Sequence, residues 1–527
     1  MKDLNGYKPV IGLEIHIQLA TQSKMFSSAA NKPGTKNPNV NIDEVVTAEP
    51  GTLPVLNQEA VRLGVMAGMA LNCEIPEFSK FDRKHYFYPD LPKGYQISQY
   101  DEPIAQNGYV DIEVNGQSKR IRITRAHLEE DAGKNTHPSG LPYSLVDLNR
   151  AGAPLLEIVT EPDIETAEEA RIFLQELRNI VRYVGASEAE MSTGTMRCEP
   201  NISVRKPGEE GLPNYKVEVK NINSFKFAEA AINYEIPRQI EMLEKGETPK
   251  QVTMGWDEKN NQTVEQRSKE EANDYRYFPE PDLPVMHFSQ EWREDIKQSL
   301  PELPMHKRKR FAEEFGLGDD VVENLVQWKE LTFYFENVVS EIDAWLKSGD
   351  NVILNEGEAG VEGSRDPSSQ ASHPFGHRQD DTKGSDRTKL IKLVANWCLQ
   401  EFSAKLNSEG LLPEEAKVTP ENFAELVMLI DSGKISGSAA KEVFAVMFDK
   451  GGEPDHIVED LGLAQVSDTA EIESVVDKIL AGNPKAVEDY QAGQQKSFGF
   501  LVGQVMKEMQ GKANPGVINE LLKKKLG

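Results

Sequence analysis

The first part of the chain alternates apolar and polar residues in several short runs. In residues 10–19 (VIGLEIHIQL), apolar and polar side chains fall on opposite faces of an extended segment, because successive side chains of a β-strand point to opposite sides. Val110–Val114 and Arg120–Thr124 alternate in the same way, and the connection between them begins with Asn115 and Gly116. An Asn-Gly pair between alternating runs is a strong hairpin signal. The pattern therefore predicts antiparallel β-sheet in this part of the chain.

Helical periodicity is mixed with these strands. Thr166–Gly185 has apolar residues at helical spacing, a Thr in the N-cap position with Glu169 three residues later, and a Gly at its end. These features are typical of a capped helix. From about residue 296 onward, helical periodicity dominates. We therefore predict an α+β domain, in which a mixed sheet is combined with helices, followed by an all-α region.

Changes in composition divide the chain into three parts. The Pro301–Pro304 segment marks a change of pattern, and we assign residues 1–295 to the α+β domain, residues 296–417 to a helical connector and residues 418–527 to a small helical tail. Within the connector, residues 355–387 are rich in Gly, Ser, Asp, Pro and His and lack apolar periodicity. Such a segment buries too little apolar surface to offset its ordering entropy. We therefore expect a disordered insertion there.

The charge and the cysteine content restrict the class of protein. The chain has 86 acidic and 59 basic residues and a net charge of −27, which argues against indiscriminate binding to DNA or RNA. No apolar run approaches the roughly 18 residues of a membrane span, and the N-terminus lacks the apolar core of a signal peptide. We expect a cytoplasmic protein with no membrane partner and no DNA partner. The three cysteines form no C-x-x-C pair, so structural zinc is not predicted.

The polar face of the first strand carries candidate chemistry. Glu14 and His16 are two residues apart, so their backbone positions are separated by about 6.5–7 Å on one face. That separation suits two groups that converge on one hydrated cation or on one substrate. The alternative is an ordinary strand with a polar outer face.

Two further stretches carry acidic residues. Glu157 lies within Leu155–Val159, which otherwise has the pattern of a buried strand, and a charge buried there is costly unless it is paired or coordinated. Residues 127–134 (HLEEDAGK) place three consecutive acids beside a His, although such a run is also typical of solvated surface. Together, three acids and one imidazole would make an oxygen-rich site suited to Mg²⁺; they are Glu14, Glu130, Glu157 and His16.

Aromatic and cationic residues alternate in two other segments, residues 81–96 and residues 267–281. Such loops stack on nucleic-acid bases or hold phosphates, and an aromatic-capped surface loop is the alternative interpretation. Neither segment contains a G-x-x-x-x-G-K-[ST] motif or a strand-embedded G-x-G-x-x-G motif. A P-loop or a dinucleotide-binding fold is therefore not predicted.

In these same stretches the chain closely resembles the GatB family, the B subunits of the aspartyl/glutamyl-tRNA(Asn/Gln) amidotransferases (GatCAB). The motifs that carry the resemblance occur in the family's order and are concentrated in the first 300 or so residues. They are Val10–Phe26, Phe81–Gln99, His127–Lys134, Leu145–Ile164, Met191–Arg205, Val217–Phe225 and Asp274–Leu283.

The resemblance implies a cradle-shaped catalytic domain that binds ATP, Mg²⁺ and the acceptor end of the aminoacyl-tRNA, a helical connector, and a YqeY-like tail that contacts the outside of the tRNA elbow. It implies an ATP-dependent carbon–nitrogen ligase that amidates misacylated Glu-tRNA(Gln) and, in many members, Asp-tRNA(Asn). ATP phosphorylates the side-chain carboxylate, and ammonia then displaces phosphate. A GatA-like glutaminase subunit would supply that ammonia from glutamine, and a GatC-like small subunit would complete a heterotrimer.

The resemblance also implies roles for single residues. The family's metal-site positions fall on His16, Glu130 and Glu157, and Glu14 lies one strand step from His16. We expect these four residues to bind Mg²⁺ and, through it, the phosphates of ATP, with the three acids taking part in catalysis. Lys84 and Lys93 match family lysines near the opening of the ammonia path. They are candidate catalytic residues, and Lys84 is also a candidate nucleotide ligand, although lining a polar tunnel describes both lysines equally well.

The end of the chain is locally basic, unlike the rest. Residues 496–527 contain six lysines and two glutamates, and Gly499 and Gly503 are spaced for close backbone approach. A solvated lysine face or close helix packing are the alternatives, but the family resemblance favours an RNA-facing surface. We expect a modest salt dependence of RNA binding. A rival function for the whole chain is a non-catalytic subunit that binds tRNA and assists assembly.

Overall fold

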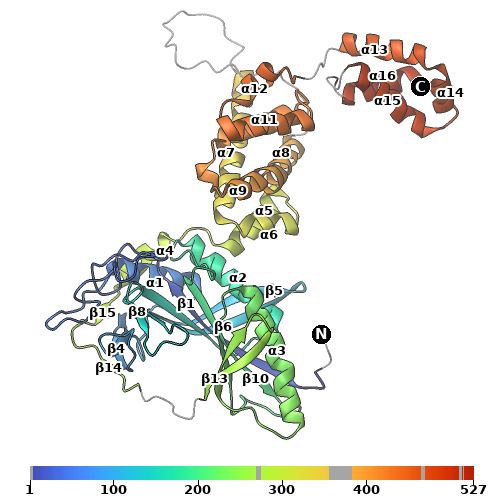
Figure 1. Ribbon diagram of the computed structural model, residues 1–527. Helices are drawn as coiled ribbons and strands as arrows, with labels where there is room; N and C mark the ends of the chain where they lie inside the picture. The colour runs from blue at the N-terminus through green and yellow to red at the C-terminus, as the bar shows by residue number, and fades with distance from the viewer. Residues whose placement is uncertain (1–3, 269–274, 355–382, 465–468, 510–512, 514) are drawn as a thin grey trace, which may run out of the picture. The chain divides into compact units, whose positions relative to one another are not determined.

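The computed structural model describes residues 4–268, 275–354, 383–464, 469–509, 513 and 515–527 (Figure 1). The chain divides into two units, Met1–Pro304 and Met305–Gly527. The first unit combines sheets with helices and the second is helical, which confirms the predicted fold class. Among the described residues, no helix is long and apolar enough to cross a membrane.

The first unit is built around one large sheet with eight strands (Figure 1). Neighbouring strands are antiparallel except β11 and β12, which are parallel. From one edge to the other, the strands are β13 (Gln262–Ser268), β12 (Val252–Asp257), β11 (Val217–Lys220), β10 (Met196–Arg205), β1 (Lys8–Gln18), β9 (Pro154–Thr160), β6 (Gln117–Glu130) and β5 (Ala105–Val114).

Three small sheets surround the large one. One contains β14 (Phe278–Pro279), β3 (Asp82–His85) and β4 (Tyr95–Ser98). The other two are the pairs β15 (Met286–His287) with β2 (Phe78–Ser79), and β7 (Lys134–Thr136) with β8 (Leu145–Asp147). The first of them carries the aromatic and cationic residues that the sequence singled out.

The strand alternation predicted from the sequence is confirmed in β1. Leu13, Ile15 and Ile17 are at most 1% exposed and belong to the main hydrophobic core. The predicted hairpin is also present, since β5 and β6 pair in antiparallel register. Asn115 and Gly116 both have positive φ, 52° and 73°, as a tight hairpin turn between right-twisted strands requires.

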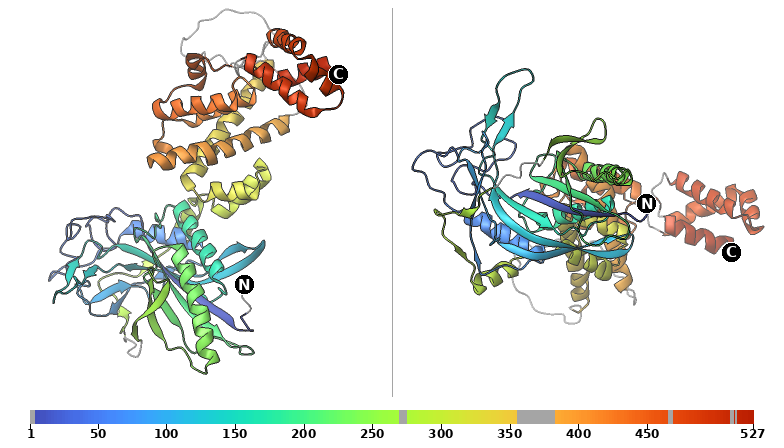
Figure 2. Two further views of the ribbon diagram at one scale, coloured as in Figure 1. Left: turned by 45° about the vertical axis from the view of Figure 1, so that its right-hand side comes forward. Right: turned by 90° about the horizontal axis from the view of Figure 1, so that it is seen from below.

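Helices cover one face of the large sheet (Figures 1 and 2). The side-chain hydroxyl of Thr166 accepts a hydrogen bond from the backbone N–H of Glu169, so the predicted N-cap of the helix that follows is confirmed. The covered face contains the main core, and the opposite face of β1, β9 and β10 is left for polar residues. The helices of this unit are α1 (Gln58–Ala70), α2 (Ala167–Tyr183), α3 (Phe225–Glu244) and α4 (Gln290–Gln298).

The second unit begins with helices that pack around aromatic side chains. The ring of Phe402 lies 4.5 Å from that of Tyr334 and 5.7 Å from that of Phe423. These elements are α5 (Pro304–Phe315), α6 (Asp319–Val326), α7 (Lys329–Leu354), α8 (Lys383–Trp397), the π-helix η1 (Cys398–Phe402), α9 (Ser403–Glu409), the 3₁₀-helix η2 (Pro413–Glu415), α10 (Pro420–Asp431), α11 (Gly437–Lys450) and α12 (Pro454–Leu461). Of the predicted insertion, residues 355–382 lie outside the described residues and 383–387 belong to α8.

The last four helices have a hydrophobic core of their own, which includes Ile472, Leu501 and Ile518. They are α13 (Thr469–Gly482), α14 (Pro484–Gln491), α15 (Gln495–Glu508) and α16 (Pro515–Leu526). Apart from the chain neighbours and the backbone of α15 itself, no described atom lies within 4 Å of the place where a Cβ would stand on Gly499 or Gly503. The two glycines of α15 therefore do not serve close packing within the described part of the chain.

Candidate active site

Three neighbouring strands bring two histidines and a glutamate into one row on the polar face of the large sheet. His16 of β1 lies directly opposite Glu157 of β9, and Glu157 lies directly opposite His127 of β6. Residues that face each other across an antiparallel ladder project from the same side of the sheet. The row His16–Glu157–His127 is therefore set by strand register.

The side chains of this row are in close contact. Oε2 of Glu157 lies 3.5 Å from Nε2 of His16 and 3.3 Å from Nε2 of His127. Glu157 and His127 are only 7% and 3% exposed. One carboxylate oxygen is thus held between two imidazoles in a site with little access to bulk water.

Two more carboxylates complete the group. Glu129 is two residues beyond His127, so it projects from the same face, and its Oε1 lies 3.5 Å from Nε2 of His16. Glu14 joins from the other side: one ligand atom from each of Glu14, His16 and Glu157 lies within 4.8 Å of the others. His127, Glu129 and Glu157 satisfy the same criterion. Glu157 is therefore shared between two sets of metal-ligating groups.

The charges of the group depend on one another. Burial lowers the pKa of His16, but contact with Glu157 and the charge of Glu129 outweigh it and raise that pKa to about 9. Burial raises the pKa of Glu157, yet His127 and His16 hold it well below its ordinary value. Burial and the negative charge of Glu157 raise the pKa of Glu14. Without a bound cation, the positive charge of the protonated His16 ring therefore offsets part of the negative charge of the nearby carboxylates.

Glu130 does not join this group. It follows Glu129 directly and points away from the row: Oε2 accepts a hydrogen bond from Nζ of Lys93 at 2.6 Å, and Oε1 accepts one from the backbone N–H of Ile97 at 2.9 Å. Of the four residues expected to bind Mg²⁺, the structure brings Glu14, His16 and Glu157 together and leaves Glu130 paired with Lys93. Glu129 lies at the place where the sequence analysis expected Glu130.

Lys84, on β3, faces the same group from the small sheet. Its Nζ lies 5.1 Å from the ring centre of Tyr275 and 5.9 Å from that of Tyr86. Burial lowers the pKa of Lys84, but the charges of Glu129, Tyr277 and Glu157 raise it above its ordinary value. The ammonium group is therefore a cation beside two tyrosine rings that interacts electrostatically with Glu129 and Glu157.

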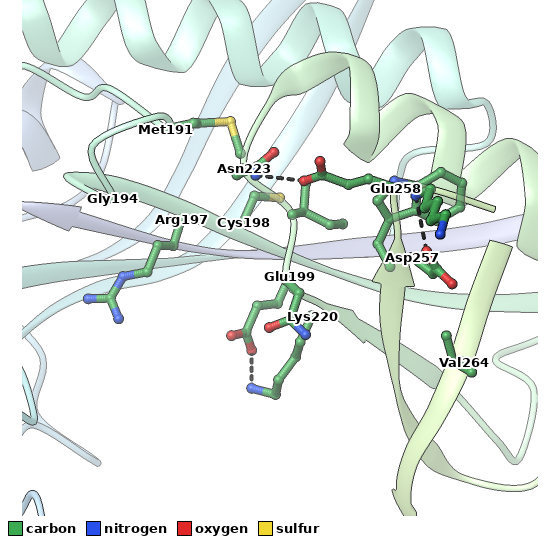
Figure 3. Close-up of a pocket in the computed structure, with 14 residues that line it drawn as sticks. Met191, Gly194, Arg197, Cys198, Glu199, Lys220, Asn223, Asp257, Glu258 and Val264 are labelled. Atoms are coloured by element: carbon green, nitrogen blue, oxygen red, sulfur yellow. Dashed lines mark hydrogen bonds and ion pairs between the residues drawn. The ribbon is translucent and has the colours of Figure 1, made fainter. Parts of the chain in front are cut away.

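A cavity of about 750 Å³ lies beside the row, at the ends of β10, β11 and β12 (Figure 3). We call it the Trp256 cavity. Arg197 and Glu199 line it, and these residues face His16 and Glu14 across the β1–β10 ladder. Nζ of Lys220 lies 2.5 Å from Oε2 of Glu199, an ion pair drawn in Figure 3. Its other walls combine apolar and amide-bearing residues, which include Met191, Asn221, Ile222, Asn223, Trp256 and Val264, with the charged residues Asp257, Glu258 and Lys259.

Comparison with known proteins shows the family of this chain. Residues 9–294 match the family described as the GatB/GatE catalytic domain, and residues 383–526 match the GatB domain family. The chain is 46% identical over 526 residues to the B subunit of the aspartyl/glutamyl-tRNA(Asn/Gln) amidotransferase of Carboxydothermus hydrogenoformans, with 99% of both chains covered. The chain belongs to the GatB family.

Other GatB relatives are similar to the same extent. The corresponding B subunits of Persephonella marina and Thermotoga neapolitana are 47% and 45% identical over 520 and 524 residues, again with 99% of both chains covered. The family resemblance predicted from the motifs is therefore confirmed over the full length of the chain.

The sequence analysis did not identify three residues of this site. His127 and Glu129 were interpreted as part of an acidic run and of a family motif but were assigned no role, although the His-x-Glu spacing mirrors the Glu-x-His spacing of β1. Arg197 lay in a motif used only for the family resemblance. The signals that would have found all three are the pairing of β6 with β9 and the pairing of β1 with β10, and a single sequence does not reveal these pairings.

Proposed function

We propose that this chain is the subunit of a glutamine-dependent tRNA amidotransferase that phosphorylates a misacylated tRNA and then amidates it. The observation that carries the proposal is the row His16–Glu157–His127, flanked by Glu14 and Glu129, on the polar face of the sheet. The relatives are named for an activity on tRNA(Asn) and tRNA(Gln). The substrates we propose are therefore Glu-tRNA(Gln) and Asp-tRNA(Asn).

The donor set suits a divalent cation. Three carboxylates, from Glu14, Glu129 and Glu157, point to one region together with His16 and His127, and carboxylates with waters and phosphates are what Mg²⁺ prefers. When bound, Mg²⁺ would neutralise phosphate charge and align it with the attacking carboxylate. Glu157 belongs to both sets of ligating groups, so it would hold the ion between the residues of β1 and those of β6.

The Trp256 cavity is the best candidate for the nucleotide. Arg197 and Lys220 line it on the side of the row His16–Glu157–His127 and are cations that a polyphosphate can contact, although they also pair with Asp131 and Glu199. Its apolar and amide-bearing walls suit a heterocyclic base. A nucleotide bound in this way would direct its terminal phosphate toward Glu14 and His16.

The chemistry requires an activated carboxylate. An oxygen of the substrate's side-chain carboxylate attacks the terminal phosphorus of ATP, the bond from that phosphorus to the bridging oxygen breaks, and ADP leaves. Ammonia then attacks the acyl carbon, phosphate leaves, and the nitrogen loses a proton. Lys84 lies near Glu129 and Glu157 and would stabilise the negative charge that develops on the acyl phosphate.

Lys93 and Glu130 belong to the ammonia side of the proposed reaction. Their ion pair lies on the opposite side of β6 from the acidic row, next to β4. The relatives are named as B subunits, which indicates a complex of several subunits, and we propose a GatA-like glutaminase and a GatC-like small subunit as partners. A polar pair of this kind would line the path along which ammonia enters.

The tail would bind the RNA. Lys496, Gly499, Phe500, Gly503 and Lys507 recur at helical spacing on α15 and are all exposed. Lys525, in contrast, pairs with Glu473 and Asp477. The α15 face therefore offers an aromatic ring and two cations on a surface that the glycines leave open to a ribose–phosphate backbone.

Replacing Glu157 tests this function against a subunit that only delivers tRNA. In the reconstituted complex, Glu157→Gln is expected to abolish ATP hydrolysis stimulated by Glu-tRNA(Gln) while tRNA binding persists. Glu168→Gln, an exposed acid on α2 beyond the other face of the sheet, is the matched control and should leave turnover unchanged. Unchanged hydrolysis in Glu157→Gln would mean that the delivery role is the correct one.

A further inference from the structure

A second cavity, of about 390 Å³, opens on the polar face of the sheet beyond Glu14. We call it the Leu212 cavity. On β10, the residues that line the Trp256 cavity end at Glu199, and those that line the Leu212 cavity begin at Asn201. The two cavities therefore lie on either side of the pair formed by Glu14 and Glu199, which face each other across the β1–β10 ladder.

We propose that the Leu212 cavity binds the 3′-terminal nucleoside of the misacylated tRNA. The inference rests on the proposed function and deepens it, because it separates the site of the acceptor from the site of the nucleotide. Phosphoryl transfer requires donor and acceptor to meet at one point from different directions. Two cavities that adjoin opposite ends of one carboxylate pair provide that geometry.

The floor of the Leu212 cavity is formed by a glycine inside a strand. Glycine in a strand interior often marks a place where a ligand approaches closely. A Cβ on Gly12 would stand 3.7 Å from the carbonyl oxygen of Thr160 and 3.9 Å from Cα of Pro162, which is ordinary van der Waals contact. Packing therefore does not require glycine here, and its effect is to keep the floor open two residues from Glu14.

The walls suit a base and a ribose. Leu212 is 72% exposed although it is large and apolar, and it lies with Pro213 and Pro162 around the cavity. Such apolar surfaces pack against the faces of a heterocycle, while Asn214 and Gln251 offer amide groups to its edge. The volume is within the range of about 300–1,000 Å³ that is typical of small-ligand sites.

The charges favour an RNA end over a triphosphate. The Leu212 cavity is lined by one cation, Lys216, which is exposed, and by the carboxylate of Glu14. One cation matches the single phosphodiester that precedes a terminal nucleoside. The Trp256 cavity is lined by three cations, Arg197, Lys220 and Lys259, and by three acids, Glu199, Asp257 and Glu258. It therefore offers more cations to a triphosphate than the Leu212 cavity does.

Because the Leu212 cavity lies beside Glu14, it determines where the amino acid on a bound tRNA end would lie. The ribose of the terminal nucleoside carries the amino acid in ester linkage. A nucleoside in the Leu212 cavity would therefore extend the amino-acid side chain past Glu14 toward His16 and Glu157, where the carboxylate is to be phosphorylated. Residues of the cavity would then determine the KM for aminoacyl-tRNA without touching ATP.

Two surface variants test the proposal, Leu212→Asp and Lys216→Glu, both at exposed positions. Lys226→Glu, an exposed lysine on α3, is the matched control for the change of charge. Amidation is measured with the reconstituted complex and ammonium chloride as the nitrogen donor. We expect the KM for Glu-tRNA(Gln) to rise about tenfold, which corresponds to about 1.4 kcal/mol, with unchanged affinity for a fluorescent ATP analogue. The same rise is expected with a misacylated acceptor-stem minihelix, which lacks the elbow.

Three results would overturn the assignment. A weaker affinity for the ATP analogue with an unchanged KM for tRNA would show that the Leu212 cavity binds ATP instead. A rise in KM with full-length tRNA but not with the minihelix would place the contact elsewhere on the RNA, and no change with either substrate would exclude a substrate site. Failure of the proposed function would be seen separately, as ATP hydrolysis that survives in Glu157→Gln.

Discussion

Oε2 of Glu157 lies 3.5 Å from Nε2 of His16, across the ladder between β9 and β1. The contact joins segments that are far apart in the sequence, and its geometry follows from the register of two central strands. Because β9 also pairs with β6, the same carboxylate meets His127 on its other side. The charge that the sequence places inside an apolar strand is thus paired on both sides, as a buried carboxylate requires.

The neighbouring acids Glu129 and Glu130 are predicted to have separable roles. Glu129 faces the row and Glu130 pairs with Lys93. Glu129→Gln is expected to weaken Mn²⁺ binding by about 10–100-fold and to lower ATP hydrolysis and amidation together. Glu130→Gln should leave Mn²⁺ affinity unchanged and lower amidation alone. Isothermal titration with Mn²⁺ and parallel assays of the two activities measure both effects, and the opposite assignment of effects would contradict the structure.

His127 is predicted to position Glu157. His127 is 3% exposed, and its Nε2 lies 3.3 Å from Oε2 of Glu157. His127→Gln, which keeps a polar group near that position, should retain more metal affinity than His127→Ala, and the loss in the alanine variant should be about 10–100-fold. His137→Gln, in the exposed loop between β7 and β8, is the control. Equal metal affinity in all three variants would assign His127 a packing role only.

The α15 face predicts a small but measurable electrostatic contribution to tRNA binding. Lys496 and Lys507 are exposed on it, and each lysine that contacts a phosphate adds about one to the salt slope. The Lys496→Ala, Lys507→Ala double variant should lower the slope of log affinity against log salt by about two, with no change in ATP affinity. A steep slope that survives the double variant would show that the main phosphate contacts lie elsewhere.

Glu425 of α10 predicts a pH dependence of stability in the second unit. Burial and the charges of Asp455 and Glu453 raise its pKa from 4.5 to about 7, although Lys434 opposes the shift. The folded state therefore holds a proton that the unfolded state has lost between pH 4.5 and 7, and stability falls as pH rises through that range. Glu425→Gln should raise Tm relative to the parent chain at pH 8 more than at pH 4.5. An equal difference at both pH values would contradict the shift.

The sequence predicted the elements of the site better than their assembly. Alternation in residues 10–19 assigned β1 and its two faces, and the apolar run around Glu157 assigned β9. It did not distinguish Glu129 from Glu130, because a shift of one residue moves a side chain to the other face. The pairing of β6 with β9 contains an irregularity between Ile123 and Arg125, so counting alternation from the hairpin does not fix which acid faces the row.

The two cavities could not be predicted from the sequence, for a related reason. The Trp256 cavity and the Leu212 cavity are each formed by several strands and the loops between them. Local periodicity assigns a residue to an element but not to a neighbour in another strand. The family motifs contained most of these residues, yet only the strand order β11-β10-β1-β9 places them beside His16 and Glu157.

The central claim is that His16 and Glu157 hold a divalent ion together. Pulsed electron paramagnetic resonance of Mn²⁺ bound to the reconstituted complex with ATP tests it most directly, because a coordinated imidazole gives a ¹⁴N coupling. The account predicts a ¹⁴N coupling in the parent chain, its loss in His16→Ala and weaker Mn²⁺ binding in Glu157→Gln, with the control Glu168→Gln unchanged. Tight Mn²⁺ binding without any nitrogen coupling, or with a coupling that survives in a variant lacking the imidazoles of both His16 and His127, would contradict it.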